Sequence, residues 1–101
     1  MEKLDFYING AWVKPSRSKT LDVINPATEE PVAKISLGSE VDVNLAVNAA
    51  KSAFDGYSQT TVAQRIELLT TIREIYKRRI ADVADAIQTE MGAPTSLARG
   101  A

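Results

Sequence analysis

The longest regular pattern of apolar and polar positions covers residues 61–91, a stretch without glycine or proline. Its large apolar residues recur at steps of three or four, which is the spacing of a continuous stripe along a helix and not that of a strand. The stripe consists of Val62, Ile66, Leu69, Ile72, Tyr76, Ile80, Val83, Ile87 and Met91. The pattern therefore predicts helical structure that must pack against another element.

The ends of this stretch carry helix boundary signals. Thr61 and Gln64 have the spacing of a capping box, in which each side chain satisfies a free backbone donor of the other residue. Gly92 follows the last stripe residue, and Pro94 stands two positions further on, an order typical of a helix C-terminus. We therefore expect the helical region to begin at residue 61 and to end at residue 92.

The charge order inside the stretch indicates a break. Three basic residues at positions 77–79 precede Asp82 and Asp85, which is the order expected where one helix ends and another begins. We expect two helices that meet near residues 79–81. A single uninterrupted helix is the alternative, because Glu74 can pair with Arg78 one turn later and no breaker residue intervenes.

The first forty residues show the period-two patterns of short strands. Apolar runs on both sides of Asn9-Gly10 predict a β-hairpin over residues 6–13, because this dipeptide tolerates the positive φ angles of a tight turn. Residues 21–24 and 33–37 predict two further strands, which should pair antiparallel. This part of the chain is expected to form short antiparallel strands.

A helix is expected between the strands and the long stripe. Ser39 has the character of an N-cap, with Asp42 at the capping-box position. The helix should run to about Phe54, and residues 55–60, which include Gly56, should form a turn. Its apolar residues lie on most sides, so we expect neighbouring elements to cover much of this helix.

The composition excludes several kinds of chemistry. The chain of 101 residues contains no cysteine and no histidine, so it lacks a thiol nucleophile, the usual general base and the commonest metal ligand. A net charge of −1 gives no general attraction to nucleic acid or anionic membranes. We find no signal peptide and no span of transmembrane length. These features predict a cytoplasmic protein without nucleic-acid or membrane partners.

The search for catalytic motifs is negative. The five glycines form neither a dinucleotide fingerprint nor a phosphate loop, and no carboxylates are paired at a spacing that suggests acid–base catalysis. The one basic cluster consists of Arg73, Lys77, Arg78 and Arg79. No aromatic residue is placed to help it bind bases, so we interpret it as a solvated helix end and not as a phosphate site.

Five motifs follow one another along the chain. They are residues 7–13 (Tyr-Ile-Asn-Gly-Ala-Trp-Val), residues 23–30, the alanine-rich helix at 42–54, Arg65, and residues 90–94 (Glu-Met-Gly-Ala-Pro). In this order they resemble the N-terminal region of the aldehyde dehydrogenase superfamily over nearly the whole chain. The family usually has lysine before the final proline, where alanine stands here, and this position takes part in no catalytic step.

The resemblance implies an α/β fold as part of an aldehyde dehydrogenase-like structure. The visible span would comprise an N-terminal hairpin and short antiparallel strands, followed by two to three α-helices. Residues 1–101 would form the N-terminal part of the NAD(P)-binding, Rossmann-like domain. The remainder of that domain, the catalytic domain and the oligomerisation segment would be absent from this sequence.

The resemblance also implies an activity. In the family a cysteine attacks the aldehyde to form a thiohemiacetal, hydride passes to NAD or NADP, and a glutamate activates the water that hydrolyses the thioester. An asparagine helps to hold the oxyanion. None of these residues lies within this sequence, and Asn25 and Glu90 do not match them. We therefore expect no catalytic or cofactor-binding residue here, an inactive isolated chain, and a homodimer or homotetramer at full length.

Some family members hold a monovalent cation near this region. Their ligands are main-chain oxygens just before the Asn-Pro pair and an acidic side chain just before the Gly-x-Pro turn. The matching positions are Val23, Ile24 and Glu90, and oxygen ligands suit a hard cation. In the alternative interpretation, Glu90 is a solvated residue of the last helical turn.

A hypothesis of a different class is an autonomous, non-catalytic α+β interaction module. The absence of a chemical site supports it. The broad apolar surface of the helix at residues 39–54, together with the long stripe, argues against it, because two short hairpins cannot cover that much surface.

Overall fold

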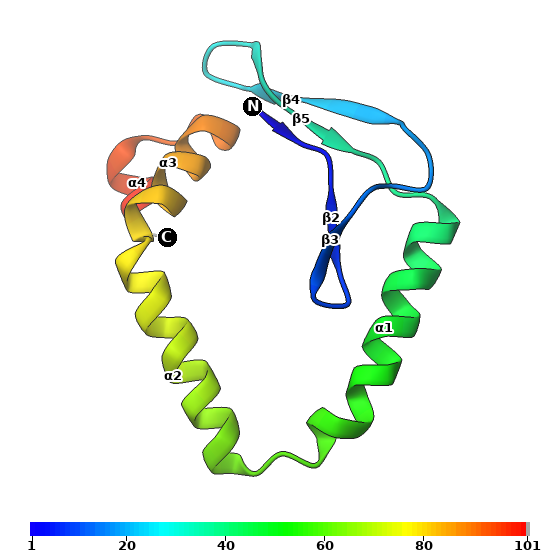
Figure 1. The fold of residues 1–101 in the computed structure, drawn as a ribbon. Helices are drawn as coiled ribbons and strands as arrows, with labels where there is room; N and C mark the ends of the chain where they lie inside the picture. Colours follow the sequence, from blue (N-terminus) through cyan, green and yellow to red (C-terminus); the bar gives the residue numbers. More distant parts are fainter. Residues whose placement is uncertain (101) are drawn as a thin grey trace. The chain divides into compact units, whose positions relative to one another are not determined.

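The computed structural model describes residues 1–100. These residues divide into two compact units, whose elements can be followed in Figure 1. The first unit comprises Met1–Val23 and Ala33–Gln59, and the second comprises Ile24–Val32 and the chain from Thr60 onward. The boundary between the units runs through the β-hairpin of residues 20–36. This hairpin therefore contributes residues to both units.

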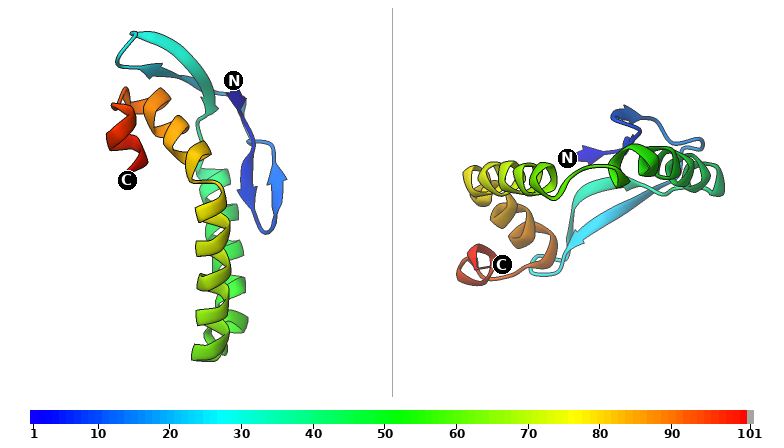
Figure 2. Two further views of the ribbon diagram at one scale, coloured as in Figure 1. Left: turned by 90° about the vertical axis from the view of Figure 1, so that its left-hand side faces the viewer. Right: turned by 90° about the horizontal axis from the view of Figure 1, so that it is seen from below.

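The hairpin at the N-terminus confirms the prediction made from the Asn-Gly pair. Strands β2 (Phe6–Ile8) and β3 (Ala11–Val13) pair antiparallel. Asn9 and Gly10 have φ angles of 54° and 77°, the left-handed conformation that a two-residue turn matched to strand twist requires. Figure 2 shows this hairpin beside the first helix of its unit.

A three-stranded sheet has the strand order β1-β5-β4. Strands β4 (Thr20–Asn25) and β5 (Glu30–Ser36) are hydrogen-bonded neighbours, and a connection this short permits only the predicted antiparallel pairing. Strand β5 begins at Glu30, three residues earlier than predicted. Strand β1 (Glu2–Lys3) pairs parallel with β5 and was not predicted, because two polar residues show no periodicity.

Helix α1 (Glu40–Ser58) begins as predicted, after Ser39. The predicted end near Phe54 is wrong, since the helix continues through Gly56 for a further turn. A glycine inside a helix costs about 1 kcal/mol relative to alanine, and that cost does not stop a helix that has already formed. A side chain added at Gly56 would meet nothing within 4 Å, so packing does not require glycine there.

The long stripe forms two helices, α2 (Val62–Arg78) and α3 (Ile80–Met91). The alternative of one uninterrupted helix is wrong, because Arg79 leaves the helical conformation with φ −111° and ψ 13°. The capping box is confirmed: the Thr61 N–H donates to Gln64 Oε1 over 2.8 Å, and the Gln64 N–H donates to Thr61 Oγ1 over 3.2 Å.

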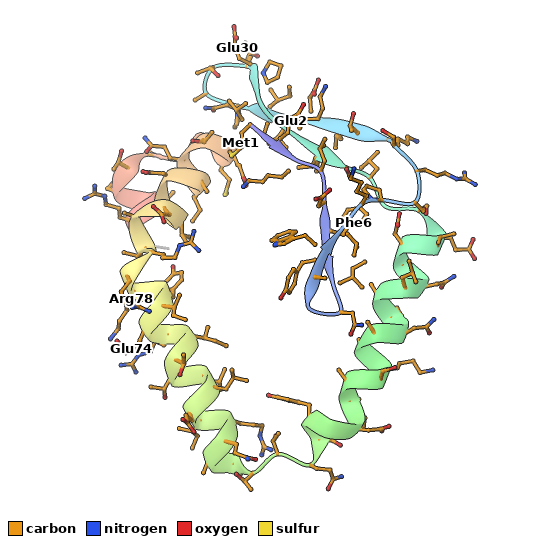
Figure 3. All side chains as sticks on the ribbon, in the orientation of Figure 1. Met1, Glu2, Phe6, Glu30, Glu74 and Arg78 are labelled. Carbon is orange, nitrogen blue, oxygen red and sulfur yellow. The ribbon has the colours of Figure 1, made fainter. Side chains whose placement is uncertain are left out.

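The charged residues around the break form pairs other than the Glu74–Arg78 pair of the single-helix interpretation. Glu74 contacts Arg73 at 3.4 Å and Lys77 at 3.5 Å, and Arg79 contacts Asp82 at 3.3 Å. Glu74 and Arg78 are labelled one turn apart on α2 in Figure 3. The acidic residue at the start of α3 thus contacts the basic residue that precedes the helix, in agreement with the predicted charge order.

A fourth helix, α4 (Thr95–Arg99), follows Pro94 and was not predicted. It packs against α3 in the second unit, where Ala84 and Ala98 are almost fully buried. The Gln88 side-chain amide also donates to Thr95 Oγ1 over 3.1 Å. Small side chains therefore bring these two short helices together.

Over residues 1–100, no helix combines the length and apolarity needed to cross a membrane.

Candidate functional site

The three candidate cation ligands lie on two elements. Val23 and Ile24 are neighbours in β4, and Glu90 is the penultimate residue of α3. The unit boundary falls between Val23 and Ile24, so only Ile24 and Glu90 share a unit. Among the residues that the structure describes, no three His, Cys, Asp or Glu side chains are grouped to hold a metal. A cation here would depend on main-chain carbonyls and a single carboxylate.

The end of α3 does lie against the turn that follows β4. A Cβ atom added at Gly92 would lie 3.0 Å from the Ala27 nitrogen and 3.2 Å from Pro26 Cγ. Gly92 also has φ 64°, which a side chain disfavours. Both the backbone conformation and the limited space favour glycine, and this contact joins the helix that carries Glu90 to the strand that carries Ile24.

The turn itself is held by Asn25. Its side-chain Oδ1 accepts the Ala27 N–H over 2.9 Å, and its carbonyl accepts the Glu29 N–H over 2.7 Å. An asparagine that accepts from the backbone two residues later forms an Asx turn, which fixes the local chain direction. The Asn-Pro pair therefore has a structural role in the surface that α3 meets.

The best-defined polar cluster lies in the first unit and joins Ser16, Ser39 and Asp42. Asp42 Oδ1 accepts the Ser16 N–H over 2.9 Å, and Asp42 Oδ2 accepts the Ser39 N–H over 2.9 Å. The two serine hydroxyls lie 2.6 Å apart, and each also lies within hydrogen-bond distance of Asp42 Oδ2. We call these three residues the Asp42 latch, because they fasten the loop after β3 to the start of α1.

The carboxylate of the latch is buried and charged. Asp42 is 6% exposed, and the pKa of its carboxyl is lowered first by the backbone hydrogen bond from Ser39 and then by that from Ser16. Burial acts in the opposite direction and is outweighed, because N–H donors favour the ionised form. All of its oxygens are satisfied within the chain, so the latch has no group left to bind a ligand.

Sequence reasoning identified Asp42 and Ser39 as a capping pair but missed Ser16. The two hydrogen-bonded residues Ser16 and Asp42 are 26 positions apart, and no local pattern connects a loop serine to a distant helix start. Within residues 1–100 the fold brings no catalytic constellation together either. The sequence contains no cysteine or histidine, and the carboxyl of Asp42, whose pKa is lowered, is held in its charged form.

The helices expose most of their apolar side chains. In the described part of the chain no large side chain is fully buried, and Phe54, Val62 and Leu69 are each more than 60% exposed. Large apolar side chains that gather in an exposed patch mark an interaction site. The exposed apolar residues of each unit are therefore candidate docking residues.

A groove of the first unit, about 500 Å³ in volume, runs between the β2–β3 hairpin and α1. Ile8, Val13 and Leu45 supply apolar lining, while Lys14 and Asn48 supply polar groups. Phe6, labelled in Figure 3, closes over the turn before α1, since a Cβ at Gly38 would lie 3.7 Å from its ring. The lining also includes Ser52, but no histidine or cysteine is present in the sequence to form a nucleophile–base pair there.

Comparison with known proteins identifies the family to which this fold belongs. The model of the aldehyde dehydrogenase family matches residues 12–101. A 3-succinoylsemialdehyde-pyridine dehydrogenase from a Pseudomonas species is 50% identical over 90 residues, which are 89% of this chain and 19% of that protein. The aldehyde dehydrogenase of Bartonella henselae has a crystal structure that superposes with a TM-score of 0.97 at 46% identity, covering 100% of this chain and 21% of that one.

A further crystal structure, that of aldehyde dehydrogenase C from Pseudomonas syringae with NAD+ and octanal, gives a TM-score of 0.93 at 43% identity. It covers 96% of this chain and 20% of that chain. The fold is thus the α/β N-terminal portion of an aldehyde dehydrogenase. The chain belongs to the aldehyde dehydrogenase family, and it spans about one fifth of the length of the relatives it matches.

Proposed function

We propose that this chain is the N-terminal part of the NAD(P)-binding domain of an aldehyde dehydrogenase. The complete enzyme would oxidise an aldehyde to a carboxylic acid through a cysteine thiohemiacetal and thioester, with NAD or NADP as hydride acceptor. The observation that carries the proposal is the superposition of the whole chain on the start of an aldehyde dehydrogenase structure. The relative that contains NAD+ and octanal supports the cofactor and substrate classes.

The residues of this chain would serve as scaffold for a Rossmann-like domain. The glycine spacing matches no nucleotide-binding loop, so the pyrophosphate of the cofactor would be held by residues that this sequence does not contain. The bound cofactor supplies the hydride acceptor. The residues of this chain would hold the β4–β5 turn and the start of α1 in place through Gly92 and the Asp42 latch.

The monovalent cation remains a proposal for Val23, Ile24 and Glu90. Two carbonyls and one carboxylate are hard oxygen donors, which fit such an ion chemically. The contact of Gly92 with Pro26 and Ala27 supports a connection between α3 and the end of β4. Unchanged activity and stability of a Glu90→Gln enzyme across sodium and potassium series would contradict the site.

A cytoplasmic location and a homodimeric or homotetrameric assembly are proposed on the family resemblance. The autonomous interaction module is a weaker second candidate. The absence of a catalytic constellation from the fold favours it, whereas the exposed apolar residues of α1 and α2 argue against an independent unit. A monomeric isolated chain with a sharp melting transition would support the module.

A chimera tests the function directly. The chain replaces the matching first fifth of the Bartonella henselae enzyme, and NAD(P)H formation is followed with a panel of aldehydes. We expect an active chimera and no turnover by the 101-residue chain alone. A chimera that folds and assembles but reduces neither NAD nor NADP would overturn the proposed function.

A further inference from the structure

The sequence contains four asparagines, Asn9, Asn25, Asn44 and Asn48. Asparagine is a thermolabile residue, because the nitrogen of the following peptide group can attack its side-chain carbonyl carbon and expel ammonia. The attack needs an N–H on the following residue, little bulk around that nitrogen, and a backbone that can rotate. These three requirements distinguish the four positions.

Three of the four asparagines fail at least one requirement. Pro26 follows Asn25 and has no N–H to lose, and the Asn25 side chain already accepts the Ala27 N–H over 2.9 Å. Asn44 and Asn48 lie within α1, where the N–H of the next residue donates to the carbonyl four positions earlier. A leucine and an alanine follow these two asparagines, so a side chain also shields each nitrogen.

Asn9 meets all three requirements. It precedes Gly10, where a Cβ atom would meet nothing within 4 Å, so neither a side chain nor a neighbouring element shields the Gly10 nitrogen. Both residues are exposed. The flanking strands β2 and β3 are three residues long, and so short a ladder opens readily at its tip. The backbone of Asn9, which has φ 54° in the closed turn, can then rotate toward ring closure.

We propose that Asn9 is a site of spontaneous deamidation, at which the β2–β3 turn is converted to isoaspartate. The Gly10 amide loses its proton to hydroxide, and its nitrogen attacks Asn9 Cγ. The Cγ–Nδ2 bond breaks, ammonia leaves with a proton from water, and a succinimide ring forms. Water then opens the ring: addition at Cγ gives aspartate, whereas addition at the main-chain carbonyl carbon gives isoaspartate, in which Gly10 is attached through Cγ. The product carries one additional negative charge, and the reaction uses no group of the proposed dehydrogenase.

The isoaspartyl form cannot keep the register of the hairpin. Isoaspartate adds a methylene group to the main chain, and a two-residue turn sets the pairing of the strands that it joins. The pairing of Tyr7 with Trp12 and of Ile8 with Ala11 depends on that register. So does the contact between the Tyr7 and Trp12 rings, whose centroids lie 5.1 Å apart. Deamidation is therefore expected to separate β2 from β3.

Peptide mapping of the 101-residue chain during incubation at mildly alkaline pH tests the site. We expect Asn9 to lose ammonia about tenfold or more faster than Asn44 and Asn48, whose neighbouring N–H groups become available only after the helix opens. The product should be mostly isoaspartate, which an isoaspartyl methyltransferase labels. The rate should fall at mildly acidic pH, because the attacking nitrogen must be deprotonated. The same order of rates is expected in the Bartonella henselae chimera.

Asn9→Asp separates the change of backbone from the added charge. Aspartate followed by glycine also suits a two-residue turn, so this variant carries the charge of the product on a normal main chain. In hydrogen exchange, fresh Asn9→Asp should keep the protection of β2 and β3, whereas the chromatographically purified isoaspartyl form should lose it.

Two results would overturn the proposal while leaving the proposed function intact. One is an Asn9 that loses ammonia no faster than Asn44, or that yields aspartate without isoaspartate. The other is equal protection of β2 and β3 in Asn9→Asp and in the isoaspartyl form, which would show that the register survives the longer main chain.

Discussion

The two units each contain one tight junction between a helix and a loop, and the junctions are held by opposite means. In the first unit the Asp42 carboxylate accepts hydrogen bonds from the Ser16 and Ser39 backbones. In the second unit the α3 terminus approaches the β4–β5 turn so closely that only glycine fits at position 92. The first junction depends on charge and donors, and the second depends on shape.

This difference determines which perturbations weaken each junction. A hydrogen-bonded carboxylate responds to protonation, because the donors that surround it favour the charged form. A steric fit is indifferent to pH and responds to added volume, because a packed contact cannot relax around an extra methyl group without shifting the backbone. Changes in pH and in side-chain volume should therefore separate the two junctions.

The largest expected effect comes from Gly92→Ala. The left-handed backbone costs a non-glycine residue about 1–2 kcal/mol, and the new Cβ would lie 3.0 Å from the Ala27 nitrogen, a backbone atom that cannot rotate away. Overpacking of this kind costs about a further 1–3 kcal/mol. We expect a loss of about 2–5 kcal/mol in urea unfolding of the chain, with faster hydrogen exchange in α3 and the β4–β5 turn.

Two other glycines are matched controls for that substitution. Gly10 has φ 77° but would meet nothing within 4 Å, so Gly10→Ala should cost only the conformational term of about 1–2 kcal/mol. Gly56 lies in the last turn of α1 with open space around it, and Gly56→Ala should stabilise by up to about 0.5–1 kcal/mol, the figure for the middle of a helix. If Gly92→Ala cost no more than Gly10→Ala, the steric account of the second junction would be wrong.

The next effect is the pH dependence of the Asp42 latch. The folded pKa of Asp42 lies below its ordinary value, so the latch contributes fully above the unfolded pKa of about 3.9. That contribution is lost as the pH falls through the lower, folded pKa. The shift comes from the Ser39 and Ser16 hydrogen bonds, with burial acting against it.

Asp42→Asn tests this dependence. An amide keeps one acceptor oxygen but turns a donor toward one of the two backbone N–H groups, so the variant should be less stable than the wild type at neutral pH. The stability difference should shrink as both proteins are acidified below pH of about 4. A stability difference that stays constant down to the lowest pH measured would contradict the proposed role of the latch. The rate of hydrogen exchange in α3, which takes no part in the latch, is the internal control.

The sequence predicted elements best where the signal was local. The Asn-Gly turn, the Thr61 capping box and the break at Arg79 each depend on residues within a few positions of one another, and the structure confirms all three. The failures have equally physical causes. Helix α1 continues through Gly56 because glycine weakens a helix without ending it, and α4 is too short to show a period.

The site was less predictable because its contacts are long-range. Ser16 reaches Asp42 across 26 positions, and Gly92 meets Ala27 from a different element. Asp42 was visible as a capping residue and Gly92 as a helix C-cap, but their partners depend on how strands and helices come together. The expected activity came from the family resemblance, and the residues of this chain could not have suggested it, since they include no cysteine.

A smaller effect is expected from Ser16→Ala, which separates the contribution of the Ser16 hydroxyl from that of the backbone donors in the latch. The substitution removes the hydroxyl that lies 2.6 Å from Ser39 Oγ and keeps the N–H that donates to Asp42. The hydroxyl contact is exposed, so we expect a loss of about 0.5–1 kcal/mol in urea unfolding. The acid dependence should remain, because the backbone donors that lower the Asp42 pKa are intact. Ser18→Ala, two residues further along the same loop, is the control.

The smallest expected effect comes from Asp82→Asn, which removes a carboxylate that contacts Arg79 at 3.3 Å with both side chains about 70% exposed. Water and salt screen such a pair, so its loss should cost only about 0.2–0.5 kcal/mol at low ionic strength. That cost should vanish at high salt. The Asp42→Asn difference should persist at high salt, because Asp42 is buried and mobile ions screen its short backbone hydrogen bonds much less than an exposed ion pair. A cost at Asp82 that equals the cost at Asp42 and resists salt would contradict the view that burial and backbone donors distinguish the Asp42 carboxylate from an exposed one.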